Sequence, residues 1–313
     1  YQGFMATWLI GLALRNESAK AQGYIDNALV RWNTVIRPYL ATTVRGGYLH
    51  EGTSYGTHSA SFIFQYLSAH ASATGEDILA APGFLWPREF LTCKRYLTTP
   101  TRDRLYPGGN QSRESHAILC DYDRTAPLIS LSYLDADTAG RMRWWLDHIT
   151  PAHNVWRGNE WAEFLWYRDD IPPLDYTTTD GRSAPDSLGY LSPGAGWMTS
   201  RSSWDTDGVQ VAMMAGANLE GHQDRAQCGF LIYRGDWLAA AARLNSHSGL
   251  LVESIFNNAV TIGGFGQWWG SDSARLLHCE ETAEYAHLAG DAARAYDNTR
   301  AGDIRSPLPV LFT

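Results

Sequence analysis

The residues best suited to chemistry lie in one short stretch, Gly46-Gly47-Tyr48-Leu49-His50-Glu51-Gly52-Thr53-Ser54-Tyr55-Gly56. It combines glycines, which allow positive φ and close approach of a ligand, with an imidazole, a carboxylate and two phenols. Thr53 or Ser54 is placed to cap a following helix, with Tyr55 in its first turn near unpaired N–H groups. The positive helix end can stabilise a phenolate there. The alternative is a tight connection between two helices, with Tyr55 packed in the core.

A second polar cluster reads Gly221-His222-Gln223-Asp224-Arg225-Ala226-Gln227-Cys228-Gly229-Phe230. His222 precedes a predicted strand, so it can stand at the rim of a sheet. A lone histidine is more often structural, but its polar neighbours bring the functional and the structural interpretation into balance. His222 and Asp224 could instead be metal ligands, although a zinc site needs three or four ligands.

The composition restricts the classes of function. The chain has 313 residues, of which 44% are hydrophobic and 12% aromatic, enough for a sizeable core and two domains. Most of the 13 Trp should lie in that core, but Trp and Tyr also form stacking platforms for sugars. The net charge of −8 argues against nucleic acid as the main partner. No run has the length of a membrane span, and the first residues do not resemble a signal peptide.

The four cysteines show neither CxxC nor zinc-finger spacing, so they leave the redox compartment undecided between buried thiols and disulfides.

The first half of the chain predicts helices from its apolar spacing. We expect them over residues 4–15, 18–40, 57–72, 86–97, 126–134, 136–149 and 156–167. Paired antiparallel helices without intervening strands are typical of an α/α toroid or a superhelix. No motif recurs at a fixed period, which argues against a TPR-like or HEAT-like array.

The second half changes to a period of two. Short strands are predicted over 197–201, 209–214, 229–233, 259–262 and 285–288. We therefore predict an α+β multidomain chain, with an incomplete α/α toroid over 1–170, a proline-rich linker over 171–193 and an antiparallel β sandwich over 194–313. Both ends look cut, because the chain starts inside a helical pattern and stops on a strand-like one.

The order of these segments resembles the heparinase II/III group of polysaccharide lyases and the related alginate and oligo-uronide lyases. The matching stretches are GGYLHEGTSYG, GWMTSRSSWDTDGVQVAMMAG, GHQDRAQCGFLIYRGDWLA, NNAVTIGG and EYAHLAGDAARAY. The resemblance implies a toroid followed by a sandwich and an anionic polysaccharide or oligosaccharide as the partner. It also implies a periplasmic or secreted location, and no cofactor.

Carried over residue by residue, the resemblance makes Tyr55 the catalytic tyrosine, Glu51 its companion acid and His222 the active-site histidine. The family's further Asn or His would fall at or just before Tyr1. His50, Glu51, Gln223 and Arg225 are then candidates to hold the substrate.

Relatives carry a structural zinc site whose positions fall on Asp224, Ala241 and Asn257 here, and Ala226 stands where an aspartate is common. These residues supply too few ligands, so we predict no zinc.

The chemistry implied is β-elimination on a 1,4-linked uronide, which needs a group that neutralises the carboxylate, a base and an acid. Tyr55 could be base and then acid, or the acid opposite a histidine base, and the sequence leaves both open. Arg201 could hold a carboxylate or form an ion pair at the sheet edge.

Two alternatives remain. A hydrolase would need a carboxylate pair such as Glu51 with Asp121 or Asp123. A glycan-binding protein with weakened catalysis would explain the changed zinc site.

Overall fold

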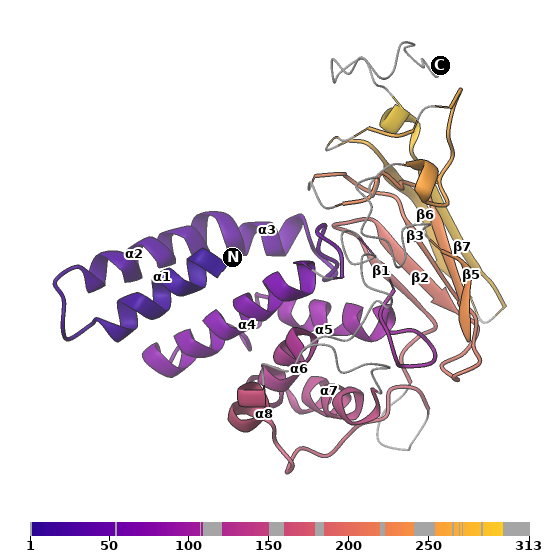
Figure 1. Ribbon diagram of the computed structural model, residues 1–313. Coiled ribbons are helices and arrows are strands. Elements are labelled where there is room, and N and C mark those ends of the chain that lie inside the picture. Colours follow the sequence, from indigo (N-terminus) through magenta and orange to yellow (C-terminus); the bar gives the residue numbers. More distant parts are fainter. Residues whose placement is uncertain are drawn as a thin grey trace.

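The computed structural model describes most of the chain (Figure 1). The described residues are 2–53, 55–106, 108, 121–149, 160–178, 185–219, 223–240, 254–264, 266–268, 270, 272–282 and 284–296. Helices occupy the first half and antiparallel strands the second, so the predicted α+β class is confirmed. The toroid, the sandwich and the domain boundaries stay predictions.

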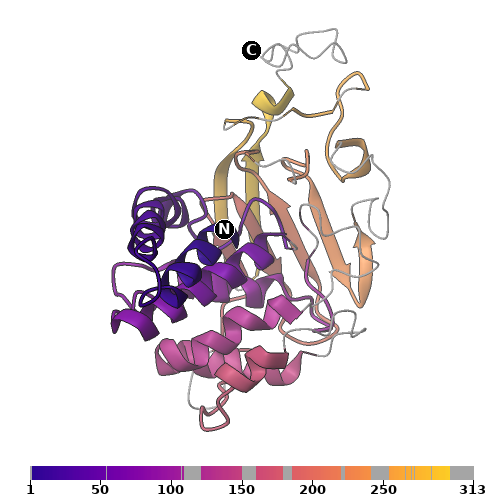
Figure 2. The ribbon, with the colours of Figure 1, turned by 60° about the vertical axis from the view of Figure 1, so that its left-hand side comes forward.

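The helices pack as an arc of neighbouring pairs (Figures 1 and 2). They are α1 (Gln2–Ala13), α2 (Ala21–Arg31), η1 (Trp32–Ile36), α3 (Arg37–Thr42), α4 (Tyr55–Thr74), α5 (Trp86–Leu97), α6 (Asp121–Tyr133), α7 (Ala136–His148) and α8 (Glu160–Trp166). The single helix predicted over 18–40 is divided by η1, a π-helical turn. Pro38 follows this turn and has no N–H to donate, which disfavours regular α-helical bonding there.

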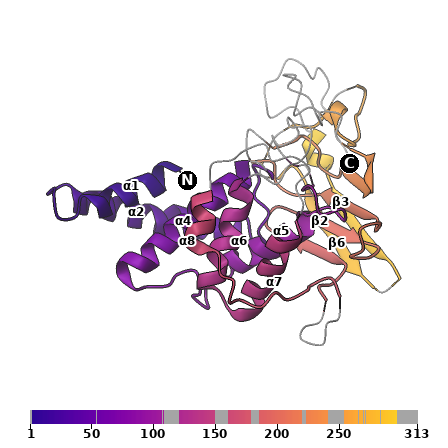
Figure 3. The ribbon, with the colours of Figure 1, turned by 60° about the horizontal axis from the view of Figure 1, so that its bottom comes forward.

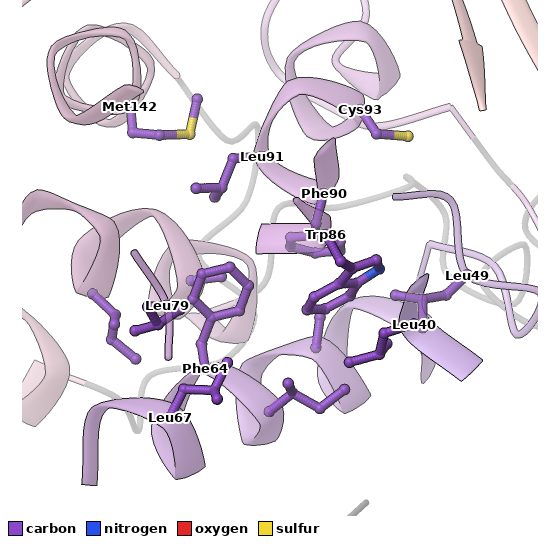
Figure 4. Close-up of a cluster of buried hydrophobic side chains, with 14 of the residues drawn as sticks. Leu40, Leu49, Phe64, Leu67, Leu79, Trp86, Phe90, Leu91, Cys93 and Met142 are labelled. Carbon is purple, nitrogen blue, oxygen red and sulfur yellow. The ribbon is translucent and has the colours of Figure 1, made fainter. Parts of the chain in front are cut away.

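The helical core is apolar and aromatic. Figure 4 shows Leu40, Phe64, Trp86 and Phe90 converging from α3, α4 and α5, with Leu49 arriving from the loop that precedes α4. Four tryptophans are among the largest fully buried side chains, as expected for a core role: Trp8, Trp32, Trp86 and Trp145. This packing fixes the start of α4 and the loop before it.

The strands form one five-stranded antiparallel sheet and one hairpin. The sheet contains β1 (Gly189–Ser192), β2 (Trp197–Arg201), β3 (Gln210–Met214), β4 (Phe230–Arg234) and β5 (Asp236–Ala239), in that order. The hairpin pairs β6 (Arg275–Glu281) with β7 (Ala286–Asp291), and the short helices η3 (Ser254–Phe256) and η4 (Ala293–Tyr296) flank it in the chain. β1 lies inside the range predicted to be a linker.

The stretch 259–262, predicted as a strand, is not one. Backbone carbonyls around this stretch accept hydrogen bonds from side chains instead of from a neighbouring strand. Tyr296 donates to the Val260 carbonyl at 2.5 Å, and Asn258 donates to the Phe230 and Ala240 carbonyls. Val260 is also exposed, so the alternating pattern has no buried side here.

The sheet meets the helices along β2 and β3, beside the end of α5 (Figure 3). The buried Arg201 guanidinium donates to the carbonyls of Thr98 at 2.5 Å, Tyr96 at 3.0 Å and Arg95 at 3.3 Å. These carbonyls belong to the last turn of α5, where a cation is favoured by the helix dipole. Arg201 thus fastens the helices to the sheet, rather than forming the edge ion pair considered from the sequence.

Replacing Arg201 by methionine should lower the free energy of unfolding by about 2–3 kcal/mol, because hydrogen bonds from a charged donor are lost and buried carbonyls remain unpaired. Urea denaturation measures the change. Arg234→Met, at an exposed position on β4, is the matched control and should leave stability almost unchanged. Equal stability of the two variants would contradict the fastening role.

Candidate functional site

The glycine-rich loop is wedged between α5 and the end of β1. The Gly46 N–H donates to the Glu89 carboxylate at 2.9 Å, and the Tyr48 N–H donates to Ser192 Oγ at 3.1 Å. Gly47 has φ of +85°, and a Cβ there would lie 2.5 Å from the Glu89 carbonyl oxygen. Only glycine fits this conformation and this gap. The loop is therefore fixed by both halves of the molecule.

Tyr55 is the first residue of α4, which confirms its predicted place in the first turn of a helix. Its side chain is 37% exposed, so the alternative in which it packs in the core is wrong. Ser54 lies outside the described residues. Of the two residues predicted as the cap, Thr53 does not serve, because its buried hydroxyl has no hydrogen-bond partner among the described residues, and a cap by Ser54 stays a prediction.

Glu51 is held beside the first turns of α4. Ser59 Oγ donates to Glu51 Oε2 at 3.2 Å. Ser59 lies four residues after Tyr55, and residues four apart share a helix face. The Glu51 carboxylate is therefore on the side of α4 that carries Tyr55, as a companion acid requires. His58 shares this face, and burial lowers the pKa of its imidazole, which favours the neutral form.

His50 is buried, with an exposed fraction of 1%. Neither ring nitrogen has a hydrogen-bond partner among the described residues. Burial lowers the pKa of His50 to about 4, so the imidazole is neutral at physiological pH. A group in this setting reaches a substrate only if the loop around it moves.

Because the pKa of His50 is lowered, we expect the folded protein to lose stability in acid. Its pKa is lower in the folded than in the unfolded state, so protonation favours unfolding. This contribution to stability is full above pH 6.5 and is lost as the pH drops towards about 4, by about 3 kcal/mol at ~1.4 kcal/mol per pKa unit. Urea denaturation at a series of pH values tests this. His50→Phe, similar in volume and not titratable, should show a smaller fall, and an identical fall would contradict the assignment.

His222 itself lies outside the described residues, but the residues that follow it are described. The Gln223 amide donates to the Ala217 carbonyl at 2.8 Å and accepts from the Leu219 N–H at 3.0 Å. Asn218 donates to the Asp224 carbonyl at 3.0 Å. Gln223 therefore ties together the two ends of the segment that contains His222. The Gln223 amide is thus used in hydrogen bonds within the loop, and the residue also lines a pocket.

Arg225 follows the segment that contains His222, and it packs against Trp268 and Ser254. Its guanidinium is 4.7 Å from the centre of the Trp268 ring, and its carbonyl accepts a hydrogen bond of 2.6 Å from Ser254. Gln227 and Gln267 exchange backbone and side-chain hydrogen bonds of 2.7 Å next to it. These buried hydrogen bonds between amide groups hold the residues that follow His222. Arg225 is part of the same packing, and its role here is structural.

One pocket brings the two sequence clusters together. It is lined by Tyr48 and Gly108 from the helical half, by Trp197 and β3–β4 from the sheet, and by Gln223 and Asp224. Its volume is about 60 Å³. The Tyr48 and Trp197 rings stack at 5.3 Å between centres, with an interplanar angle of 11°. Tyr55 is not among the described residues that line the pocket.

The positions matched to the relatives' zinc site meet in this pocket only in part. Asp224 and Asn257 line it, while Ala241 lies outside the described residues. Within the described ranges, no group of three or more His, Cys, Asp or Glu side chains is placed to hold a metal ion. One carboxylate and one amide do not fit a tetrahedral zinc site. The absence of zinc stays a prediction, and stoichiometric zinc in protein purified without added metal would contradict it.

The carboxylate pair considered for a hydrolase finds no support in the described residues. Asp123 is 1% exposed and forms an ion pair of 2.5 Å with the buried Lys94. This pair joins α5 to α6 within the helical core. The side chain of Asp121 lies outside the described residues.

Several residues of the site were not predicted. Tyr48, Trp197 and Asn258 stood in the quoted motifs without a role, and Asn218 and Gln267 carried no signal. A sequence shows polar residues but not which loops they connect, so only the tertiary structure reveals them.

Comparisons with known structures show where this fold recurs. A mutant of heparan sulfate lyase HepC from Pedobacter heparinus matches at a TM-score of 0.61 and 15% identity, over 92% of this chain and 40% of that chain. A crystal structure of heparinase III matches at 0.56 and 13% identity, over 89% and 40%. The predicted resemblance is thus confirmed at the level of fold, and the chain spans about 40% of the length of these structures.

No protein-family model and no curated protein matches the chain. Among the described helices, none is both long and apolar enough to cross a membrane.

Proposed function

We propose that this chain carries the catalytic centre of a polysaccharide lyase that cleaves a 1,4-linked uronide by β-elimination. Tyr55 acts as base, as acid, or as both in turn, and His222 assists it. The proposal includes an architecture of α/α toroid and β sandwich, supported by the likeness in fold to heparan sulfate lyases. It also includes a periplasmic or secreted location, which follows from the family resemblance of the sequence motifs.

The observation that carries the proposal is the shared pocket. Tyr48, from the loop that leads to Tyr55, and Gln223, which directly follows His222, line the same cavity. The two loops come from different halves of the chain, and both are held by buried hydrogen bonds. A sugar bound between them would contact groups from both clusters.

The reaction needs few groups. A base removes the C5 proton of the uronate, the electron pair forms the C4–C5 double bond, and the C4–O bond breaks as an acid protonates the leaving oxygen. Tyr55 is accessible for proton transfer, and Glu51 lies on its side of α4. The buried, neutral His50 supports the loop, and Gln223 and Arg225 support the segment of His222.

A panel of uronic-acid polymers incubated with the full-length protein tests the proposal. A lyase leaves an unsaturated uronate, which absorbs in the ultraviolet. New reducing ends without that absorbance would indicate a hydrolase, and retention on a glycan column without turnover would indicate a binding protein.

A further inference from the structure

We infer that His58 is the proton acceptor for Tyr55: its imidazole accepts a hydrogen bond from the phenol and takes the phenolic proton while Tyr55 removes the C5 proton of the uronate. This inference rests on the proposed function, and it selects the course in which Tyr55 is base and then acid. Because His58 acts through Tyr55, it is a positioning residue. It lies two residues beyond the glycine-rich stretch, so the sequence motifs gave it no role.

Helix α4 exposes one narrow stripe in its first four turns. The positions that keep some exposure between Tyr55 and His70 recur every three or four residues: Tyr55, His58, Ser59, Phe62, Gln65 and Ala69. The positions between them are buried. Residues three and four apart share a helix face, so Tyr55, His58 and Ser59 lie together on the accessible side of the helix start.

Side chains on this stripe lean towards the N-terminal end of α4, as helix geometry requires. Ser59 shows the direction, because its Oγ donates to Glu51, which precedes the helix, at 3.2 Å. The Phe62 ring reaches back in the same way to the His58 ring, with 4.6 Å between the ring centres. By the same geometry, His58 leans towards the turn that begins at Tyr55, and Phe62 packs against its imidazole from the following turn.

Both groups have the bonding capacity that this contact needs. A neutral imidazole has one donor and one acceptor nitrogen, and a phenol has one donor and two acceptor sites. A hydrogen bond from the Tyr55 hydroxyl to His58 therefore leaves sites on each group for other partners. The contact is compatible with further hydrogen bonds at either residue.

Burial favours the neutral imidazole that a proton acceptor must be. The pKa of His58 lies below its ordinary value of 6.5, and burial is the cause. Among the described residues, no charged group of the preceding loop, of α1 or of α6, which pack against α4, contributes to this shift. The titratable neighbours on the stripe are Tyr55 and, through Ser59, Glu51. At neutral pH the imidazole is therefore unprotonated.

The proton balance closes without a co-reactant. The Tyr55 oxygen takes the C5 proton while its own proton passes to His58, the C–H electron pair forms the C4–C5 double bond, and the C4–O bond breaks. Tyr55 then protonates the leaving oxygen, and the imidazolium returns its proton to Tyr55. The C5 proton has been exchanged for one on the leaving oxygen, and both side chains regain their starting state.

His58→Gln tests this role in turnover. Its kcat should fall about 10²-fold, the lower end of the usual contribution of a general acid or base, with KM almost unchanged. The wild-type kcat should fall with decreasing pH at a value below 6.5, where His58 takes up a proton. The variant should lack this acid limb. His278→Gln, at an exposed position on β6, is the matched control and should keep both the kcat and the pH profile.

Nitrogen-15 NMR of the histidine rings tests the contact without turnover, because the shift of a ring nitrogen reports its hydrogen bonding. The His58 signals are identified by their loss in His58→Gln. Tyr55→Phe should shift the acceptor nitrogen of His58, whereas Tyr24→Phe should leave it in place.

An unchanged kcat and acid limb in His58→Gln, or an unshifted His58 nitrogen in Tyr55→Phe, would overturn the inference. Either result in a protein that releases unsaturated uronate leaves the proposed function standing. A shifted nitrogen in a protein without lyase activity contradicts the proposed function and supports the contact between the two side chains.

Discussion

Tyr55→Phe should remove most of the lyase activity and leave the fold intact. If Tyr55 moves protons, its loss should lower kcat by roughly 10²–10⁴-fold, the usual contribution of a general acid or base. The variant deletes one hydroxyl and keeps the ring. Because Tyr55 is more than one-third exposed, the loss of stability should not exceed that of one hydrogen bond, about 0.5–1.5 kcal/mol.

Tyr24→Phe is the matched control, since Tyr24 on α2 is 39% exposed and lies outside both sequence clusters. The measurement is the initial rate of ultraviolet absorbance with the best uronide, together with the Tm of each variant. Substrate binding should survive in Tyr55→Phe. An unchanged kcat for this variant would rule out the mechanism proposed here.

Gly47→Ala should destabilise the protein by about 2–5 kcal/mol, through two additive causes. A non-glycine residue at positive φ costs roughly 1–2 kcal/mol. The added Cβ would also collide with the Glu89 carbonyl and the Cα of Phe90, and overpacking typically costs about 1–3 kcal/mol. Both neighbours are backbone in α5, so the loop must move, and activity should fall with stability.

Gly75→Ala separates the two causes. Gly75 has φ of +78°, close to that of Gly47, but a Cβ there would meet nothing within 4 Å. This variant should show only the cost of positive φ. Thermal unfolding of both proteins gives the comparison, and equal shifts in Tm would show that the contact with α5 is unimportant.

The sequence predicted elements best where local pattern and burial agree. The helix 86–97 and the strand 197–201 have their predicted bounds, because their apolar positions face a core. β1, β5 and β6 were not predicted. β1 stands among prolines and is defined by its pairing with β2, and β6 is largely exposed, so neither shows a clean alternation.

The candidate site was predictable as two clusters but not as a pocket. The glycines and the acid near Tyr55 mark a special loop, and the sequence placed Tyr55 at a helix start. The hydrogen bonds of Tyr48 to Ser192 and the stacking on Trp197 join residues more than a hundred positions apart. No local pattern encodes such contacts, and His222 remains a prediction.

The three carbonyls that accept hydrogen bonds from Arg201 also limit how the helices can move against the sheet. A rotation of the helices against the sheet would have to break the buried hydrogen bonds between Arg201 and the end of α5. The position of the end of α5 against β2 is therefore set at this contact. A substrate of the proposed lyase would then meet preformed surfaces at this contact, so bending or branching of the polymer chain should matter as much as its charge.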